Sequence, residues 1–229
     1  MPDSLDPEKE LFSVVIIGDF NPAIFHPSWF SSNDLLPEEE TKSAHIDFIA
    51  KEIAAFSIGG ISIQVSEDRL AYTTNEPQYE PVILDLIRGT LMLLEHTPIK
   101  TMGLNRDMVF NVGSDAARND LGFRLAPREN WDSIGVSRGM KQLTIEVERD
   151  DCSAKFVQFR VSPSYEVLNG VFIGVNQHYL LETPERTTTK SRHQEALRIL
   201  GEEWRPFMEF ARDAANKVIT PSKNNRGGA

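Results

Sequence analysis

Apolar side chains that recur at every second residue are the feature of this 229-residue chain that most limits its fold. In residues 99–112 they alternate with Gly103, Asn105 and Asp107. Three later segments alternate in the same way: Leu143, Ile145, Val147; Val157, Phe159, Val161; and Val171, Ile173, Val175, Tyr179, Leu181. Neighbouring residues of a strand point to opposite faces. The pattern therefore predicts an antiparallel meander whose apolar face is covered by helices.

Residues 11–113 contain strand, helix, hairpin, helix and strand in the order of a ferredoxin-like β-α-β-β-α-β unit. The predicted pieces are a buried strand at Phe12–Gly18 with both faces covered, a helix from Pro37 to about Ala44, a hairpin of Ile61–Val65 and Arg69–Thr74, a helix over 81–96 and a strand over 99–112. Residues 45–58 mix alternating and β-prone stretches, and their structure stays open. The fold class expected is α+β.

A long helix over residues 191–218 closes the chain, with apolar residues at steps of three and four. Gly201 and Pro206 lie inside this stripe and predict a kink. We expect the part before the kink to cover the meander and the rest to pack on the other half or on a second copy. Residues 114–219 are expected to pack with 11–113 as one domain, between a flexible N-terminus (1–10) and a disordered tail (220–229).

The order of these pieces is similar to that of a sporadically distributed family of uncharacterised bacterial proteins. The similar segments are IQVSEDRLAYTT, EPQYEPVILDL, IKTMGLNRDMVF, VNQHYLL and HQEALRILGEEW, within residues 61–210. They contain no diagnostic motif, and NPAIFHPSW has no counterpart that we can map. The resemblance implies the fold and transfers no functional residue.

Composition excludes several classes of protein. The net charge of −10 opposes binding to phosphate backbones. Cys152 is the only cysteine, which forbids a disulfide within the chain and favours a reducing compartment. The acidic start MPDSLDPEKE is unlike a secretory signal, and the apolar runs are shorter than the roughly 20 residues of a membrane span. We expect a cytoplasmic protein that binds neither nucleic acid nor membrane.

The common catalytic motifs are absent, including the phosphate-binding loop, the nucleophile elbow and the zinc-binding H-E-x-x-H. No two of the five histidines are three or four residues apart, so no local metal clip exists. The pairs Glu67-Asp68 and Asp150-Asp151 are typical of solvated turns, and the acids beside Cys152 disfavour its thiolate. Asp19 follows a buried strand, but its expected role is to bond the Asn21-Pro22 turn. We expect no metal and no cofactor.

Two features are candidates for binding. Residues 19–37 hold three prolines and four aromatic residues and predict an irregular loop. Phe25, Trp29 and Phe30 in that loop either cap the core or form a partner-binding patch. Arg106 lies on the apolar-facing side of its strand, where a guanidinium needs a carboxylate partner, or else binds an anion.

Three functions compete on this evidence. We favour a non-catalytic interaction or scaffold protein that binds protein partners and forms a homo-oligomer, through the closing helix or the aromatic loop. The alternatives are a metal-dependent hydrolase or nuclease that uses surface carboxylates, and a ferredoxin-like RNA-binding protein. The acidic charge and the glutamates on the predicted strands count against RNA.

Overall fold

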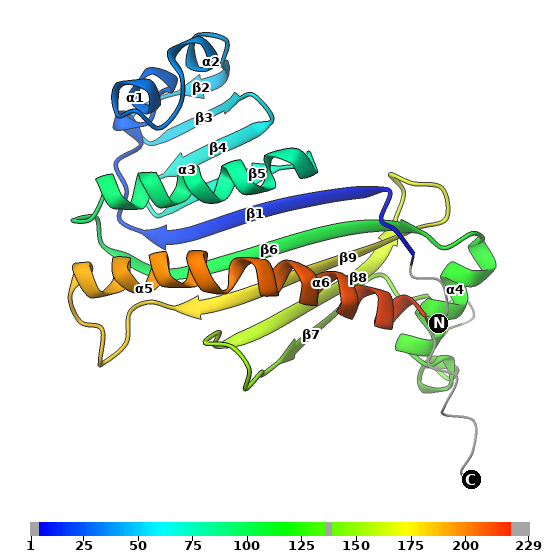
Figure 1. The fold of residues 1–229 in the computed structure, drawn as a ribbon. Coiled ribbons are helices and arrows are strands. Elements are labelled where there is room, and N and C mark those ends of the chain that lie inside the picture. The colour runs from blue at the N-terminus through cyan, green and yellow to red at the C-terminus, as the bar shows by residue number, and fades with distance from the viewer. Residues whose placement is uncertain (1–4, 136–138, 221–229) are drawn as a thin grey trace.

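The computed structural model describes residues 5–135 and 139–220. Within them the strands are β1 (Lys9–Gly18), β2 (His45–Ile49), β3 (Ile53–Ile58), β4 (Ile61–Ser66), β5 (Arg69–Thr74), β6 (Ile99–Asn111), β7 (Leu143–Val147), β8 (Phe156–Ser164) and β9 (Gly170–Leu180). They pair antiparallel in one sheet of order β2-β3-β4-β5-β1-β6-β9-β8-β7 (Figure 1). The predicted meander is the β9-β8-β7 end of this sheet.

Helices lie along one face of the sheet (Figure 1). They are α1 (Pro27–Ser32), α2 (Glu38–Lys42), α3 (Glu80–Leu93), α4 (Asp115–Leu125), α5 (Thr189–Glu202) and α6 (Trp204–Ile219), with 3₁₀ turns at Pro22–Ile24, Pro77–Tyr79 and Arg128–Trp131. The structure confirms three predictions from the sequence: a fold that mixes helices and strands, a large antiparallel sheet, and helices at the C-terminal end. None of the helices in the described residues has the length and apolar character needed to cross a membrane.

Strand alternation decides which residues meet the helices. In β1, Phe12, Val14 and Ile16 are buried on the covered face. Ile17 lies on the opposite face, which we call the open face, and is 36% exposed. β1 is central in the sheet, but the expectation that both its faces would be covered is wrong, because the helices pack on one face only.

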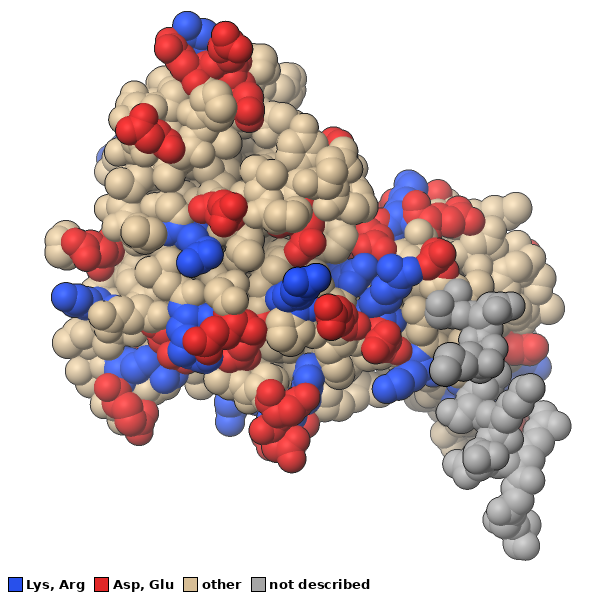
Figure 2. All heavy atoms as spheres, in the orientation of Figure 1, with Lys and Arg blue, Asp and Glu red and all other residues tan. Residues whose placement is uncertain are grey.

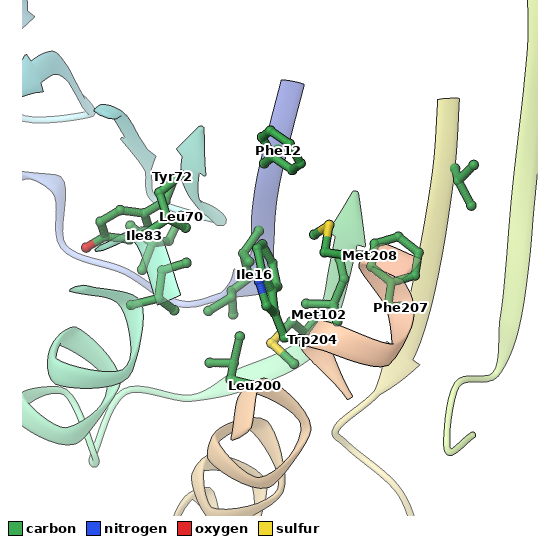
Figure 3. Close-up of a cluster of buried hydrophobic side chains, with 14 of the residues drawn as sticks. Phe12, Ile16, Leu70, Tyr72, Ile83, Met102, Leu200, Trp204, Phe207 and Met208 are labelled. Carbon is green, nitrogen blue, oxygen red and sulfur yellow. The ribbon is translucent and has the colours of Figure 1, made fainter. Parts of the chain in front are cut away.

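The core lies between the covered face and the helices (Figure 3). Trp204, Phe207 and Met208 of α6 lie over the sheet beside Leu200 of α5, and Ile83 comes from α3. The strands contribute Phe12, Ile16, Leu70, Tyr72 and Met102. Each large side chain buried in this way stabilises the fold by roughly 1.5–3 kcal/mol.

Residues 37–58 differ from the first crossover helix of a ferredoxin-like unit. α2 is only five residues long, and β2 and β3 extend the sheet beyond β4. The hairpin β4-β5, helix α3 and strand β6 form as expected. The ferredoxin-like description of residues 11–113 is therefore not confirmed.

The closing helix breaks at Glu203, inside the predicted kink region. Glu203 accepts hydrogen bonds from the Ser153 and Tyr179 hydroxyls, at 2.5 and 2.9 Å, and from Arg198 at 2.9 Å. The carboxylate of the break residue thereby holds the β7-β8 connection and β9 against the helices.

The expected placement of the two helical parts is wrong. α5 packs on α3 and β6, whereas α6 packs on β6 and β9. Leu200, Trp204, Met208, Ala211 and Ala215 are all buried within the chain. A nine-stranded sheet is wide enough to cover the whole apolar stripe, so the stripe leaves no surplus for a second copy.

The N-terminal boundary lies two residues earlier than expected, because β1 begins at Lys9. The Leu5 amide also donates a hydrogen bond to the Asn216 side chain at 2.9 Å, which ties this end of the chain to α6. Of the tail predicted to be disordered, residues 221–229 lie outside the described residues.

His193 supplies a test of the packing of α5 on α3. Its ring is buried, and Nδ1 and Nε2 lie 3.1 and 2.8 Å from the carbonyl oxygens of Leu91 and Thr97. We expect His193→Leu to lower the free energy of unfolding by about 2 kcal/mol, because the buried carbonyls lose the ring as a hydrogen-bonding neighbour. Urea unfolding measures this. His96→Leu, at a side chain that is 96% exposed, is the control, and equal effects of the two variants would contradict the role of His193.

Candidate functional site

The loop aromatics form part of the core. Phe25 and Phe30 are fully buried, and Trp29 is partly buried beside them. The Trp29 ring lies 5.3 and 5.0 Å from those of Phe25 and Phe30, and Phe30 meets Phe56 of β3 at 5.9 Å. The loop is also less irregular than predicted, since Pro22 and Pro27 each begin a short helical turn. Of the two readings of these aromatics, the cap of the core describes their position.

Arg106 lies on the covered face and is paired, as the ion-pair interpretation predicts. Its Nη2 and Nε atoms donate to Glu10 Oε2 at 2.8 and 3.2 Å, and Nη1 donates to the Met208 carbonyl at 2.5 Å. The guanidinium also lies over the Phe12 ring at 5.3 Å. These contacts occupy the guanidinium, which leaves the anion-binding alternative without support.

The candidate metal-binding carboxylates lie in separate places. Asp19 pairs with Lys100 at 3.0 Å, and Asp151 pairs with Arg149 at 2.5 Å. Glu67 and Asp68 form the turn between β4 and β5. Among the residues that the structure describes, no three His, Cys, Asp or Glu side chains gather where they could hold a metal ion.

The open face carries one polar side chain from each of the nine strands in a single cross-strand row. In sheet order the row is His45, Ser57, Ser62, Thr73, Ser13, Asn105, Asn176, Gln158 and Glu146. Most members are uncharged hydrogen-bonding groups rather than the lysines and glutamates of an ordinary solvated face. The Asn176 amide donates to Asn105 Oδ1 at 2.6 Å, and Gln158 donates to Glu146 at 3.1 Å.

A hollow of about 280 Å³ interrupts the open face near the middle of this row. It is lined by Ser13, Val15, Arg69, Asn105, Asp107, Gln158, Arg160, Gly174, Val175 and Asn176. A Cβ atom at Gly174 would lie 2.6 Å from Asp107 Oδ1, and one at Gly103 would lie 2.7 Å from the Asn176 amide nitrogen. The two glycines therefore leave the room in which Asp107 and Asn176 lie across the neighbouring strands.

Charges in the open-face hollow are poorly matched. The Asp107 side chain is 30% exposed, and its nearest cationic group is the Arg160 guanidinium at 3.8 Å, beyond hydrogen-bond distance. Burial raises the pKa of Asp107, an effect that Arg160 partly offsets. The Arg69 guanidinium, at the other side of the hollow, has no hydrogen-bond or ion-pair partner among the described residues.

A second unusual surface lies at the β2 edge of the sheet. Ile46, Phe48 and Ile49 of β2 are 51%, 46% and 41% exposed, and Ile53 of β3 is 39% exposed. Ile46 and Ile49 line a groove of about 600 Å³ between β2 and the helices α1 and α2. We call these four residues and the groove the β2 edge surface. Figure 2 shows a cluster of acidic and basic side chains over α2 and a further acidic group at the left of the same region, with mostly uncharged atoms between them.

Sequence reasoning identified Asn105 and Asp107 as residues of a polar face but missed Arg69, Arg160 and Asn176. The alternation of each strand reveals which residues share a face. Only the pairing register reveals which of them meet.

Comparison with protein-family models found no match, and comparison with curated proteins found no relative. Membership of the uncharacterised bacterial family stays a prediction.

The buried Arg106–Glu10 pair generates a stability test. Arg106→Ala leaves Glu10, whose side chain is 13% exposed, without its partner, so we expect a loss of about 3–5 kcal/mol in the free energy of unfolding. Adding Glu10→Gln should restore part of that loss. Arg205→Ala, at a side chain that is 90% exposed, is the matched control in denaturant unfolding. If Arg106→Ala left the free energy of unfolding unchanged, the structural role of the Arg106–Glu10 pair would be contradicted.

The raised pKa of Asp107 predicts how stability depends on pH. The folded state binds the Asp107 proton more tightly than the unfolded state, so stability falls as pH rises from the ordinary aspartate pKa through the raised one. Asp107→Asn should therefore raise the melting temperature at pH 7, and its advantage should vanish below the ordinary pKa. Asp213→Asn on the exposed side of α6 is the control. A destabilised Asp107→Asn protein at pH 7 would show that the carboxylate has a favourable partner.

Proposed function

We propose that this chain is a non-catalytic interaction protein that self-associates, and that the β2 edge surface is the contact. The observation that supports the proposal is the exposure of all five β2 residues at an outer edge of the sheet. An edge strand offers unpaired backbone N–H and C=O groups to a further strand. Here the edge also carries apolar side chains on both of its faces, since Ile46 and Ile49 lie opposite Phe56 and Ala54 of β3 and Phe48 lies opposite Ala55.

A second copy of the chain fits the charges of this edge. In antiparallel pairing about a two-fold axis through Ile46, the two Ile46 side chains become neighbours. Each His45 then lies opposite Asp47 of the other copy, and each Ala44 lies opposite Phe48. Opposite charges and apolar pairs across strands are favourable, and one self-complementary patch is enough to close a dimer.

The other outer strand, β7, fits self-association less well. Ile145 and Val147 are exposed there, but both lie on the covered-face side, while Thr144 and Glu146 lie on the open-face side. β7 therefore provides the matched control for β2.

The finer description of the fold belongs to the same proposal. We propose that β1, β4, β5, α3 and β6 form a ferredoxin-like unit in which α1, α2, β2 and β3 replace the first crossover helix. The inserted elements then supply the contact surface, which separates the proposed function from the scaffold. We further propose that the protein acts in the cytoplasm, as its single cysteine suggests.

Light scattering coupled to gel filtration tests self-association. At about 50 µM we expect a dimer for the unmodified chain, and a folded monomer for Ile46→Lys because the lysine places like charges at the two-fold axis. Ile145→Lys, at a residue of similar exposure on β7, should remain dimeric. A monomeric unmodified chain would reject self-association, and dissociation by Ile145→Lys alone would move the contact to β7.

A further inference from the structure

We propose that the open-face hollow binds a small sugar that carries a carboxylate or phosphate group. The sugar's hydroxyl groups would meet Asp107, Asn105 and Asn176, and its anionic group would meet Arg69. The inference is independent of self-association, because the hollow does not include the β2 edge. Its lining residues lie on β5, β1, β6, β9 and β8, and β3 and β4 separate these strands from β2.

Asp107 is the first observation that points to a ligand. Its side chain is only 30% exposed, its nearest cationic group is Arg160 at 3.8 Å, and no hydrogen bond to its carboxylate is found among the described residues. Buried polar groups in folded proteins nearly always have a partner, and an unpaired one has an energetic cost. A donor from outside the chain, such as a sugar hydroxyl, would remove that cost.

Arg69 is the second observation. Its partly buried guanidinium lines the same hollow and has no partner among the described residues. The planar guanidinium matches the geometry of carboxylate and phosphate oxygens in bidentate hydrogen bonds. With Asp107 ionised, the charges of Arg69, Arg160 and Asp107 sum to +1. The open-face hollow is therefore suited to one anionic group in a chain whose net charge is −10.

The amide side chains between these charges complete the proposed site. Asn105 and Asn176 already bond each other at 2.6 Å, which fixes the orientation of both side chains. The Asn176 side-chain oxygen and the second lone pair of Asn105 Oδ1 have no partner among the described residues, and both can accept from hydroxyl groups. Amide and carboxylate acceptors held rigidly on strands give precise positions to a polar ligand.

The size and shape of the hollow limit the ligand. A volume of about 280 Å³ lies just below the roughly 300–1,000 Å³ of small-molecule pockets. Gly174 keeps part of its floor at the level of the backbone. A single sugar ring fits these limits, whereas a folded partner would contact the whole open face.

Nuclear magnetic resonance titration of the full chain with glucose 6-phosphate, glucuronate and glucose tests the proposal. We expect saturable shifts of the Asn105 and Asn176 side-chain amides and the Gly103 and Gly174 backbone amides with both anionic sugars. Glucose should bind about tenfold or more weakly, because it lacks the partner of Arg69. Arg69→Gln should abolish the preference for the anionic sugars without lowering the melting temperature. Arg88→Gln, at an exposed arginine of α3, should bind as the unmodified chain does.

Gly174→Ala gives an independent variant, because the added methyl group would displace the Asp107 carboxylate while Arg69 stays in place. It should weaken all three sugars, whereas Arg69→Gln should weaken only the anionic ones. Equal binding of glucose and glucose 6-phosphate would overturn the proposed role of Arg69. Inorganic phosphate that binds as tightly as glucose 6-phosphate would overturn the role of the hydroxyl groups. Absence of shifts at these amides with all three sugars would overturn the site itself.

Discussion

The pairing of β1 with β6 is the interaction on which the rest of the structure depends. It runs antiparallel from the Lys9–Val109 pair to the Gly18–Ile99 pair, and it joins the β2-β5 side of the sheet to the β9-β7 side. Both strands are long, so most of their backbone N–H and C=O groups form hydrogen bonds beneath the helices. The Arg106–Glu10 ion pair links the same two strands. α5 and α6 pack beside this pair of strands, because β6 contacts both helices.

Periodicity in the sequence predicted the regular parts of this fold well. The meander, the β4-β5 hairpin, α3 and the broken closing helix all contain repeated apolar spacing that only one secondary structure explains. The helix predicted from Pro37 to about Ala44 corresponds to α2. The structure of residues 45–58 stayed open, because short elements give too few repeats and β2 exposes apolar side chains that the rule places inside. Periodicity also failed to place α5 and α6. Helix packing depends on the order of the strands in the sheet, and the spacing of apolar residues does not determine that order.

The candidate site was predictable only in part. Asn105 and Asp107 were assigned to a polar face from the alternation of a single strand. The open-face hollow needs Arg69, Asn176 and Arg160 as well, and these come from three other strands. A shift of one residue in any pairing would move such a side chain to the opposite face. The register of five strands therefore defines the open-face hollow, and a single sequence does not specify that register. The loop aromatics are a similar case. Their residue types fit either a core or a surface, and only their burial in the structure shows that they belong to the core.

The position of β1 between β5 and β6 has a consequence for the newly made chain. β1 is made before both of its neighbours in the sheet, which comprise residues 69–74 and 99–111. At a translation speed of about 5–20 residues per second, the apolar run FSVVII waits roughly 5–20 s for its second neighbour. Pairings this distant in sequence also form slowly once both strands exist. The segment that ends at the centre of the sheet therefore stays without its second neighbour while about 90 further residues are made, and until then its apolar run is open to aggregation or chaperone binding.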